Sequence, residues 1–309
     1  MDLMKDLIIV GAGPGGLSAS VYAKRAGLDA LTLEAQPISG GQVLNTYSVD
    51  NYLGLPEIGG FELGNKFREH ADDLGCPIEE SEVKDIRKTE KGFEVISKKE
   101  TYETKAVILA LGAEHSKLNI PGEEELAGMG VSYCATCDGA FFKGRAVAVV
   151  GGGDVAVEDA IYLARTCSKV YLIHRRGELR AARMLQEQLL NLSNVEVIWN
   201  TVVDEILGED QVEALSISNI KDKTSSKLPV DGIFIAVGMN PQNELLKCAG
   251  VEMDDKGFAK AGDDCVTSVP GIFAVGDIRT KRVRQIVTAV ADGANGVYSV
   301  ESYLGNLTV

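Results

Sequence analysis

The sequence predicts an α/β protein with two Rossmann-like βαβ units, because one pattern of apolar residues and glycines occurs twice. Residues 7–16 read L-I-I-V-G-A-G-P-G-G, and residues 147–156 read V-A-V-V-G-G-G-D-V-A. Each segment leads into an apolar-periodic helix and then into a second apolar run, at residues 30–33 and 170–173. A strand, a glycine-rich turn, a helix and a second strand form a βαβ unit, so the chain is expected to contain two.

Both turns have the form G-x-G-x-x-G/A and lie directly between a strand and a helix, which is the context of a dinucleotide-binding turn. Glycines allow the backbone to approach a pyrophosphate, and the following helix N-terminus presents free N–H groups to its negative charge. The candidate nucleotide-binding residues of the two turns are Gly11, Gly13, Pro14, Gly15, Gly16, Gly151, Gly153, Asp154 and Ala156.

The residues at the ends of the two second strands differ in charge. Glu34 lies 23 residues after the first glycine, where a carboxylate can accept hydrogen bonds from ribose hydroxyls. His174 holds the same place in the second copy and is followed by Arg175, Arg176 and Arg180. A basic cluster there would bind a 2′-phosphate through charge-assisted hydrogen bonds, although a solvated basic run is the alternative. The first copy therefore favours the adenosine ribose of FAD, and the second favours NADPH over NADH.

A third glycine signal lies late in the chain. Residues 271–277 read G-I-F-A-V-G-D, a short apolar strand that ends in Gly-Asp, and a helix is expected over residues 286–300. Asp277 can accept hydrogen bonds from the hydroxyls of a sugar alcohol, or it can cap a helix. Arg284 and Gln285 follow it.

Composition limits the class of protein. A length of 309 residues favours two domains, and a net charge of -14 disfavours nucleic acid and anionic membranes as partners. The apolar run at residues 7–10 is too short for a secretory signal or a membrane span, so we expect a cytoplasmic protein. Four cysteines are scattered singly and are expected to be buried small side chains, namely Cys76, Cys167, Cys248 and Cys265.

The other two cysteines, Cys134 and Cys137, form a C-x-x-C pair shortly before the second glycine-rich strand. Structural zinc needs four ligands, and the chain has no second such pair and only three scattered histidines, so no metal is expected. A structural disulfide is disfavoured in a cytoplasmic chain, which leaves a redox dithiol as the favoured interpretation. Asp138 is a candidate proton donor to a leaving thiolate, or else a helix N-cap.

With these motifs in place, the whole chain resembles the low-molecular-weight, NADPH-dependent thioredoxin reductases. The resemblance includes further segments at residues 40–42, 51–52, 109–113 and 121–122. It implies that Gly41, Gln42, Asn51, Ala110, Gly112, Asp277, Arg284 and Gln285 also contact FAD. A ferredoxin-dependent branch of that family lacks the second glycine motif and the His-Arg-Arg cluster, and both are present here.

The resemblance implies two Rossmann-like domains in three layers (ββα), with the NADPH domain inserted into the FAD domain. Residues 1–115 and 245–309 would bind FAD, and residues 116–244 would bind NADPH and carry the C-x-x-C pair. Hinges are expected near residues 113–118 and 242–246, together with a homodimer and a rotation of the domains during turnover. Electrons would pass from NADPH through FAD to the cysteines and then to thioredoxin. Cys137 would be the sulfur nearer the flavin, and Cys134 would attack the partner.

The alternative function is that of a related flavin dithiol enzyme. It would act on a glutaredoxin-like or peroxiredoxin-system partner, or as a dithiol oxidase that uses oxygen. A non-catalytic nucleotide sensor is a further class, against which Cys134, Cys137 and Asp138 argue.

Overall fold

The computed structural model describes residues 4–46 and 48–307. The chain divides into two compact units, the first formed by Met1–Glu114 with Asn240–Val309 and the second by His115–Met239. A second unit inserted between two parts of the first unit was expected from the sequence. The allocation of the two nucleotides to residues 1–115 with 245–309 and to residues 116–244 stays a prediction.

The first unit is built around a seven-stranded sheet, in the order β3-β2-β1-β6-β5-β4 with β17 paired to β6. Strands β1, β2, β3, β17 and the second half of β6 run parallel, whereas β4 and β5 form an antiparallel extension. Its elements are β1 (Lys5–Val10), α1 (Pro14–Arg25), β2 (Ala30–Glu34), η1 (Gly41–Asn45), α2 (Gly60–Asp73), β3 (Ile78–Glu80), β4 (Val83–Lys88), β5 (Phe93–Ser97), β6 (Thr101–Leu109), β7 (Ala113–His115), β16 (Met239–Pro241), α6 (Glu244–Cys248), β17 (Ile272–Ala274), η3 (Gly276–Ile278) and α7 (Ile286–Leu307).

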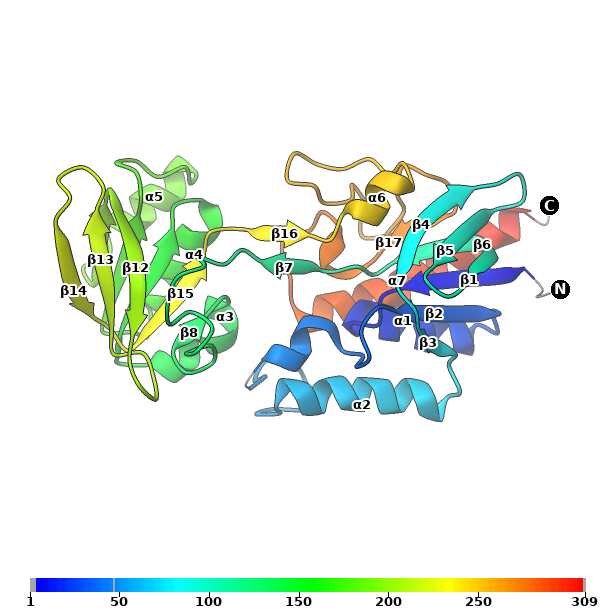
Figure 1. Cartoon of the computed structure of the whole chain (residues 1–309), viewed down its shortest axis with the longest axis horizontal. Coiled ribbons are helices and arrows are strands. Elements are labelled where there is room, and N and C mark those ends of the chain that lie inside the picture. The colour runs from blue at the N-terminus through cyan, green and yellow to red at the C-terminus, as the bar shows by residue number, and fades with distance from the viewer. Residues whose placement is uncertain (1–3, 47, 308–309) are drawn as a thin grey trace. The chain divides into compact units, whose positions relative to one another are not determined.

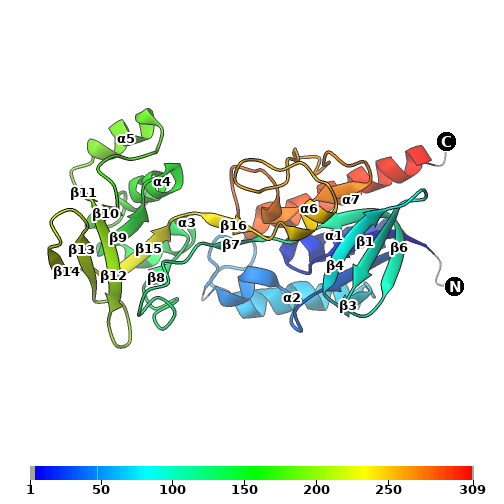
Figure 2. The same cartoon turned by 45° about the horizontal axis from the view of Figure 1, so that its top comes forward.

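The second unit repeats this plan on a smaller scale, with a parallel sheet in the order β11-β10-β9-β15-β8 and an antiparallel sheet in the order β12-β13-β14. Helices α4 and α5 lie on one side of the parallel sheet and β12–β14 lie on the other (Figures 1 and 2). Its elements are β8 (Val131–Ser132), α3 (Ala135–Asp138), η2 (Gly139–Phe142), β9 (Ala146–Gly151), α4 (Asp154–Leu163), β10 (Lys169–His174), α5 (Arg183–Leu190), β11 (Val195–Trp199), β12 (Thr201–Leu207), β13 (Ala214–Asn219), β14 (Ser225–Pro229) and β15 (Gly232–Ala236).

The central strands explain why each unit has three layers. Side chains of a strand alternate between its two faces, so a strand that is apolar throughout needs a covering layer on each side. In β9, Val147 and Val149 pack with the helices, whereas Ala148 and Val150 pack with β12 and β13. Strand β1 divides its residues between two clusters in the same alternating way. The predicted fold class, two Rossmann-like units in ββα layers, is confirmed.

The two connections between the units pair with each other. Strands β7 and β16 form a two-stranded sheet, and the Ser116 N–H donates to the Gly238 carbonyl at 3.0 Å. The chain thus leaves the first unit and returns to it through neighbouring strands (Figure 1). Strand β7 overlaps the first predicted hinge, at residues 113–118, and strand β16 lies just before the second, at residues 242–246.

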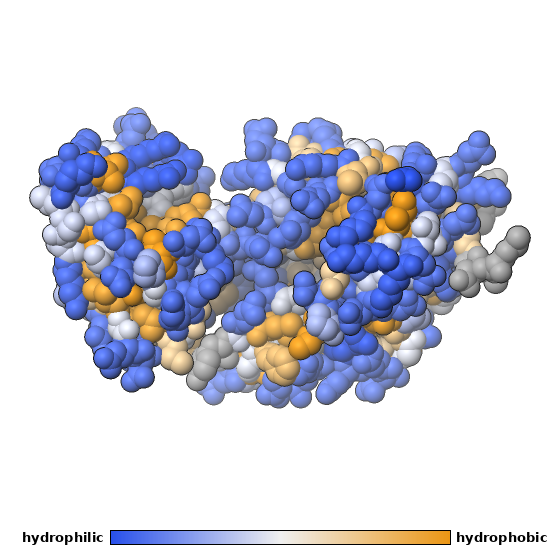
Figure 3. Space-filling model, in the orientation of Figure 1, coloured by the Kyte–Doolittle hydropathy of each residue, from blue (hydrophilic) through white to orange (hydrophobic). Residues whose placement is uncertain are grey.

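Three of the four single cysteines are buried as expected, but the expectation is wrong for Cys248, which is exposed. It ends the short helix α6, where Leu246 is the buried residue, and a position two residues further along a helix faces away from it. Hydrophilic residues predominate on the face that Figure 3 presents, in line with the net charge of -14. No helix within the described residues is long and apolar enough to cross a membrane.

Candidate active site

The first glycine-rich turn joins β1 to α1, and its glycines are required by close backbone contacts. A Cβ atom at Gly16 would lie 1.8 Å from the Gly11 carbonyl oxygen, and one at Gly11 would lie 2.5 Å from the carbonyl oxygen of Ala110. Helix α1 starts with Pro14 at its first position, where the missing N–H costs no hydrogen bond. The glycines therefore leave the backbone at the N-terminus of α1 uncovered by side chains, as a pyrophosphate site requires.

Glu34 ends β2 beside this turn, as the sequence predicted. Its Oε2 accepts a hydrogen bond from the Ala12 N–H at 2.5 Å, and its Oε1 accepts one from the Gln36 N–H at 2.9 Å. The carboxylate is thereby fixed against the backbone of the glycine turn. Each carboxylate oxygen has two lone pairs, so Glu34 can accept ribose hydroxyls in addition to these two bonds.

The segment after β2 folds back onto the same turn. The Gly40 N–H donates to the Ala12 carbonyl at 2.8 Å, and a Cβ atom at Gly41 would lie 3.3 Å from Gly13 Cα. Gln42 donates from Nε2 to the Ala113 carbonyl at the start of β7. The first two contacts bring the predicted residue Gly41 to the first nucleotide turn, and the third joins the predicted residue Gln42 to the start of β7.

Two further predicted residues meet each other in the first unit. Asn51 Nδ2 donates to Gln285 Oε1 at 2.8 Å, which joins the segment before α2 to the start of α7. The Gly112 carbonyl accepts a hydrogen bond from the Gln242 N–H at 3.3 Å, next to the paired connections.

Asp277 carries an unsatisfied buried oxygen. It lies within η3 after β17, and its Oδ1 is buried with no hydrogen-bond partner among the described residues. Burial raises the pKa of this carboxyl above its ordinary value. A buried acceptor without a partner costs free energy, and a ligand hydroxyl would satisfy it.

Arg284 points its guanidinium at the loop around Asp277. It donates to the carbonyl oxygens of Arg279 at 3.1 Å, Lys281 at 3.2 Å and Asp277 at 3.4 Å, and it stacks over the Phe258 ring at 4.1 Å. Burial lowers the pKa of Arg284. The side chain therefore holds the loop that carries Asp277, and its predicted contact with a cofactor stays a proposal.

Asp292 was missed by the sequence analysis, although an acidic residue among mostly small and apolar residues in the first half of α7 was a usable signal. It is 3% exposed and accepts hydrogen bonds from Arg279 at 2.7 and 2.8 Å, from Lys281 at 2.8 Å and from the Gly276 N–H at 2.9 Å. Burial opposes its ionisation, but the two cations outweigh burial and lower the pKa. The ion-paired cluster fixes Gly276 and, through it, the position of Asp277.

The second glycine-rich turn joins β9 to α4. A Cβ atom at Gly151 would lie 2.5 Å from the methyl of Ala156 and 2.5 Å from the Ala236 carbonyl oxygen, whereas one at Gly153 would meet nothing within 4 Å. Asp154 Oδ1 accepts the Ala182 N–H at 2.7 Å. The turn is therefore crowded on its inner side and open at Gly153, and Asp154 supports the loop that follows β10.

The predicted basic residues at the end of β10 and after it form two groups, three exposed arginines and one buried histidine. Arg175, Arg176 and Arg180 are exposed, and the Arg180 N–H donates to the Gly152 carbonyl at 2.7 Å. This hydrogen bond places the Arg180 backbone at the second glycine turn, where the sequence placed a 2′-phosphate reader.

His174 differs from the arginines, because it is only 5% exposed. A Cβ atom at Gly152 would lie 2.2 Å from its ring, which therefore supports the glycine turn from beneath. Burial lowers its pKa, and the charges of Arg180 and Arg176 lower it further, while the nearby backbone groups of Gly151 and Glu178 oppose the shift. The ring is neutral near pH 7, so it adds no charge to the predicted cluster.

Cys134 and Cys137 form a disulfide with a Cα–Cα separation of 5.3 Å. Cys134 is the N-cap residue of the single-turn helix α3, and both cysteines are partly exposed. Asp138 ends this turn, and its side chain makes no capping hydrogen bond to η2 within the described residues. Its Oδ2 accepts the hydroxyl of Ser132 at 2.5 Å instead, which is a contact that no sequence pattern announced.

Glu123 was also missed by the sequence analysis. It is 1% exposed and accepts the N–H groups of Asn119 at 2.6 Å and Leu118 at 3.0 Å, as well as the Tyr133 hydroxyl at 2.8 Å. Burial raises the pKa of Tyr133, and Glu123 raises it further. The Tyr133 ring stacks on His115 with centroids 5.4 Å apart. This cluster ties the entry segment of the second unit to the residue before Cys134.

The disulfide and the second nucleotide turn lie at one edge of one sheet. Strands β8, β9, β10 and β15 are parallel, with Ser132 opposite Phe234 and Gly151 opposite Ala236. The carboxyl ends of parallel strands share an edge, and that edge is where open α/β sheets bind ligands. The glycine turn, the arginines and the disulfide therefore belong to one face of the second unit.

The residues of both turns fit the nucleotides that the sequence predicted. In the first unit, the bare turn, the Glu34 carboxylate and the unsatisfied Asp277 oxygen suit the pyrophosphate, ribose and hydroxylated chain of FAD. In the second unit, the open Gly153 and three exposed arginines suit an anionic dinucleotide. Among the described residues, no group of three or more His, Cys, Asp and Glu side chains could hold a metal ion.

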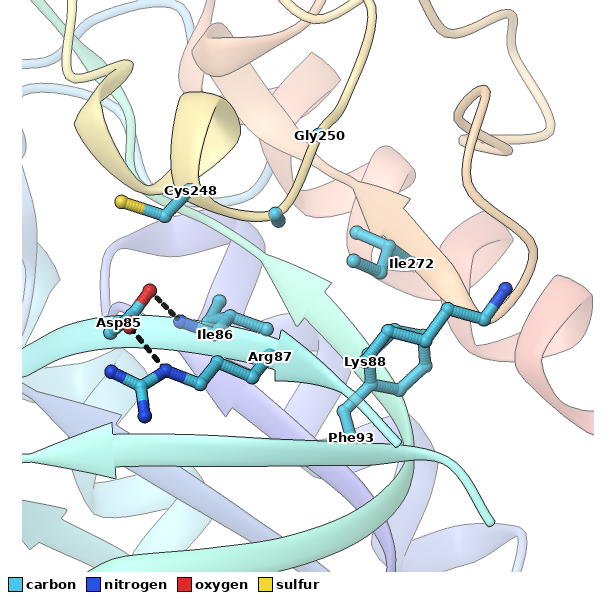
Figure 4. Close-up of a pocket in the computed structure, with 9 residues that line it drawn as sticks. Asp85, Ile86, Arg87, Lys88, Phe93, Cys248, Gly250 and Ile272 are labelled. Atoms are coloured by element: carbon cyan, nitrogen blue, oxygen red, sulfur yellow. Dashed lines mark hydrogen bonds and ion pairs between the residues drawn. The ribbon is translucent and has the colours of Figure 1, made fainter. Parts of the chain in front are cut away.

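A cavity of about 430 Å³ in the first unit is separate from these features. Its walls come from β4, β5, β17 and the end of α6, and the Arg87–Asp85 ion pair lies at its edge (Figure 4). It contains Cys248 but none of the predicted site residues. We therefore place the chemistry at the strand ends and not in this cavity.

Two dinucleotide turns and a cysteine pair that can cycle between disulfide and dithiol define a class, the nucleotide-linked disulfide oxidoreductases. The sequence profile of the pyridine nucleotide-disulphide oxidoreductases matches residues 5–293, and the chain belongs to this family.

Named relatives agree with the resemblance drawn from the motifs. The chain is 43% identical over 303 residues to a thioredoxin reductase of Listeria innocua, which covers 98% of this chain and 94% of the relative. It is 44% identical to a thioredoxin reductase of Bacillus subtilis, with 98% and 95% covered. The crystal structure of thioredoxin reductase from Streptococcus pyogenes matches with a TM-score of 0.92 at 41% identity, covering 99% of this chain and 100% of that one. The recognised resemblance is confirmed.

Proposed function

We propose that the protein is an NADPH-dependent thioredoxin-disulfide reductase. The observation that carries the proposal is the Cys134–Cys137 disulfide at the same sheet edge as the second nucleotide turn. The overall reaction converts NADPH, a proton and oxidised thioredoxin into NADP⁺ and thioredoxin with two thiols. Bound FAD would carry the electron pair between the nicotinamide and the disulfide. We further propose that the enzyme is a cytoplasmic homodimer.

Each group of residues has a role in this reaction. Arg175, Arg176 and Arg180 would bind the 2′-phosphate of NADPH, because guanidinium groups form charge-assisted hydrogen bonds with phosphate oxygens. Glu34 would accept the ribose hydroxyls of FAD. The unsatisfied oxygen of Asp277 would accept a hydroxyl from the chain that joins the flavin to its phosphates.

Once reduced, the Cys134/Cys137 dithiol would pass its electron pair on by thiol–disulfide exchange. The Cys134 thiolate attacks a sulfur of the thioredoxin disulfide, which forms a mixed disulfide and releases one thioredoxin thiol. Cys137 then attacks Cys134, which restores the Cys134–Cys137 bond and releases the second thiol. Asp138 would donate a proton to a cysteine thiolate when the enzyme disulfide is reduced.

Turnover of thioredoxin tests the proposal directly. The purified protein with FAD should reduce thioredoxin at the expense of NADPH, and NADH should support far less turnover. Cys134→Ser and Cys137→Ser should both keep FAD but lose turnover, and Cys137→Ser should accumulate a mixed disulfide with thioredoxin on a non-reducing gel. Trapping by Cys134→Ser alone would reverse the roles of the two sulfurs. Reduction of a glutaredoxin-like or peroxiredoxin partner without reduction of thioredoxin would favour the alternative function.

We also propose that the two units rotate about the paired strands β7 and β16 during turnover. The second unit carries both the disulfide and the NADPH turn. The nicotinamide and the disulfide must therefore reach the flavin one after the other, and the reduced cysteines must then face thioredoxin. A cross-link that joins the two units should permit one half-reaction and abolish multiple turnover, measured by stopped-flow and steady-state assays. Full turnover of the cross-linked protein would contradict the rotation.

A further inference from the structure

The hydroxyl of Ser132 lies between the two ends of the redox-active segment. Ser132 ends β8 and is 5% exposed. Its Oγ accepts the Cys134 N–H at 3.1 Å and donates to Asp138 Oδ2 at 2.5 Å. One side chain therefore holds the backbone at the first cysteine and the carboxyl beside the second.

The single proton of the hydroxyl has two acceptors within reach. The Cys134 carbonyl oxygen lies 3.4 Å from Oγ, whereas Asp138 Oδ2 lies at 2.5 Å. The shorter contact and the charge that Asp138 acquires on ionisation both direct the proton to the carboxyl group. The Cys134 N–H occupies an acceptor position of the same oxygen and fixes its orientation.

We infer that Ser132 is a positioning residue that orients Asp138 and stabilises the carboxylate left after proton transfer, an assignment that rests on the proposed disulfide reductase function. Two electrons enter the Sγ–Sγ bond, which breaks to give two thiolates. One proton moves from Asp138 to a cysteine Sγ, and the resulting carboxylate accepts the Ser132 O–H. Asp138 then regains a proton from solvent.

The contact predicts a rate effect that depends on Asp138. A hydrogen bond to a charged group contributes roughly 1.5–3 kcal/mol, so Ser132→Ala should slow dithiol formation about 10- to 100-fold. Ser132→Thr keeps the hydroxyl and should recover most of the rate. In an Asp138→Asn background no carboxylate forms, so removing the Ser132 hydroxyl should have little further effect. Such non-additivity reports a direct coupling between the two side chains.

The experiment measures reduction of the Cys134–Cys137 disulfide by dithiothreitol in the FAD-loaded protein, with acid quenching and thiol labelling. Dithiothreitol supplies both electrons and becomes a cyclic disulfide, so neither NADPH nor thioredoxin is needed. The wild type, Ser132→Ala, Ser132→Thr, Asp138→Asn and the double variant Ser132→Ala/Asp138→Asn form the set. Ser218→Ala is the matched control, because Ser218 donates to Asp204 Oδ1 at 3.0 Å on an exposed part of the same unit.

The inference is supported if Ser132→Ala is slow, Ser132→Thr and Ser218→Ala react at nearly the wild-type rate, and the double variant is no slower than Asp138→Asn. Equal slowing by Ser132→Ala in both backgrounds would show a merely structural role and overturn the inference, as would a wild-type rate in Ser132→Ala. The rate of NADPH oxidation in one turnover checks that the nucleotide sites are intact. If the wild type fails to reduce thioredoxin, the proposed function fails, while the dithiothreitol series still decides the role of Ser132.

Discussion

The two βαβ units share a backbone plan but differ where each second strand ends. In the first unit, Glu34 ends β2, and its carboxylate is bound to the N–H of the glycine turn. In the second, His174 ends β10, and its neutral ring lies buried beneath the turn, so the charged groups come from the exposed arginines that follow. The same position therefore carries a partly exposed carboxylate in one copy and a buried ring in the other. The ligand preference of a repeat must be inferred from the exposed atoms and not from the position alone.

The glycine turns provide the test with the largest expected effect. Gly16 and Ala156 end the two corresponding turns. In the first unit the Gly11 carbonyl oxygen fills the space that a side chain at Gly16 would need. In the second unit Ala156 has a methyl group, and this methyl fills the space that a side chain at Gly151 would need. Gly16→Ala should lower the free energy of unfolding by about 3 kcal/mol or more and abolish FAD retention, because a backbone oxygen cannot move aside cheaply. Ala156→Gly should cost only about 1–2 kcal/mol, from the difference in helix propensity and the loss of one buried methyl group.

Urea denaturation and the FAD content per chain measure both variants. Retention of FAD and unchanged unfolding in Gly16→Ala would show that the two turns are interchangeable. Destabilisation by Ala156→Gly as large as that by Gly16→Ala would lead to the same conclusion.

The arginines of the second unit give the next largest effect. Neutralising Arg175, Arg176 and Arg180 together should raise the KM for NADPH far more than the KM for NADH. Each charge-assisted bond to the 2′-phosphate contributes roughly 1.5–3 kcal/mol, or about 10- to 100-fold in affinity. Arg183→Gln is a suitable control, because Arg183 is an exposed cation nearby that pairs with Glu187 at 3.0 Å. An equal loss of affinity for both coenzymes would show that the three side chains do not read the 2′-phosphate.

Glu34 provides the corresponding test in the first unit. Glu34→Gln should weaken FAD binding about 10-fold, the effect of one hydrogen bond to a charged group, and should leave the KM for NADPH unchanged. Glu80→Gln is the matched control, because Glu80 is an exposed carboxylate opposite Glu34 at the end of the neighbouring strand β3. Equilibrium dialysis of FAD measures both proteins. Equal FAD affinity in the two variants would remove Glu34 from the nucleotide site.

The sequence predicted the parts of this site that follow from local pattern. The duplicated glycine turns, the strand ends at Glu34 and His174, and the C-x-x-C pair each depend on spacing within a few tens of residues, which βαβ geometry converts into position. The burial of His174 at the end of β10 was not predicted. This burial depends on the turn at Gly152 and on Trp199, the paired residue on the neighbouring strand β11, whose ring centroid lies 6.4 Å away.

Local sequence patterns could not predict the residues whose roles depend on tertiary contacts. The bond from Ser132 to Asp138 crosses one helical turn that no periodicity describes. Glu123 gathers three backbone N–H groups and a tyrosine hydroxyl, and the first of three consecutive glutamates after a Pro-Gly turn gives no sign of that. Arg284 was expected at the cofactor, but its contacts in the structure are with carbonyl oxygens, which depend on the course of the loop after β17.

The smallest expected effect concerns His174. If the ring only supports the turn, His174→Asn should raise the KM for NADPH and for NADH by the same factor of several-fold. A phosphate-reading histidine would instead affect NADPH alone, and its contribution would increase as the imidazole gains a proton. Steady-state kinetics with both coenzymes distinguish these outcomes, and the triple arginine variant provides the selective reference.

The pH dependence of folding tests the same assignment independently. Burial lowers the pKa of His174 in the folded protein, so the unfolded chain, with an ordinary histidine pKa near 6.5, binds the proton more readily. The stability that the neutral ring contributes is therefore complete above about pH 6.5 and is lost as the pH falls below it. The difference in free energy of unfolding between the wild type and His174→Asn should shrink as the pH falls through and below about 6.5. A difference that grows as the pH falls would mean that the folded protein favours the charged ring, and His174 would then belong with the arginines as a phosphate ligand.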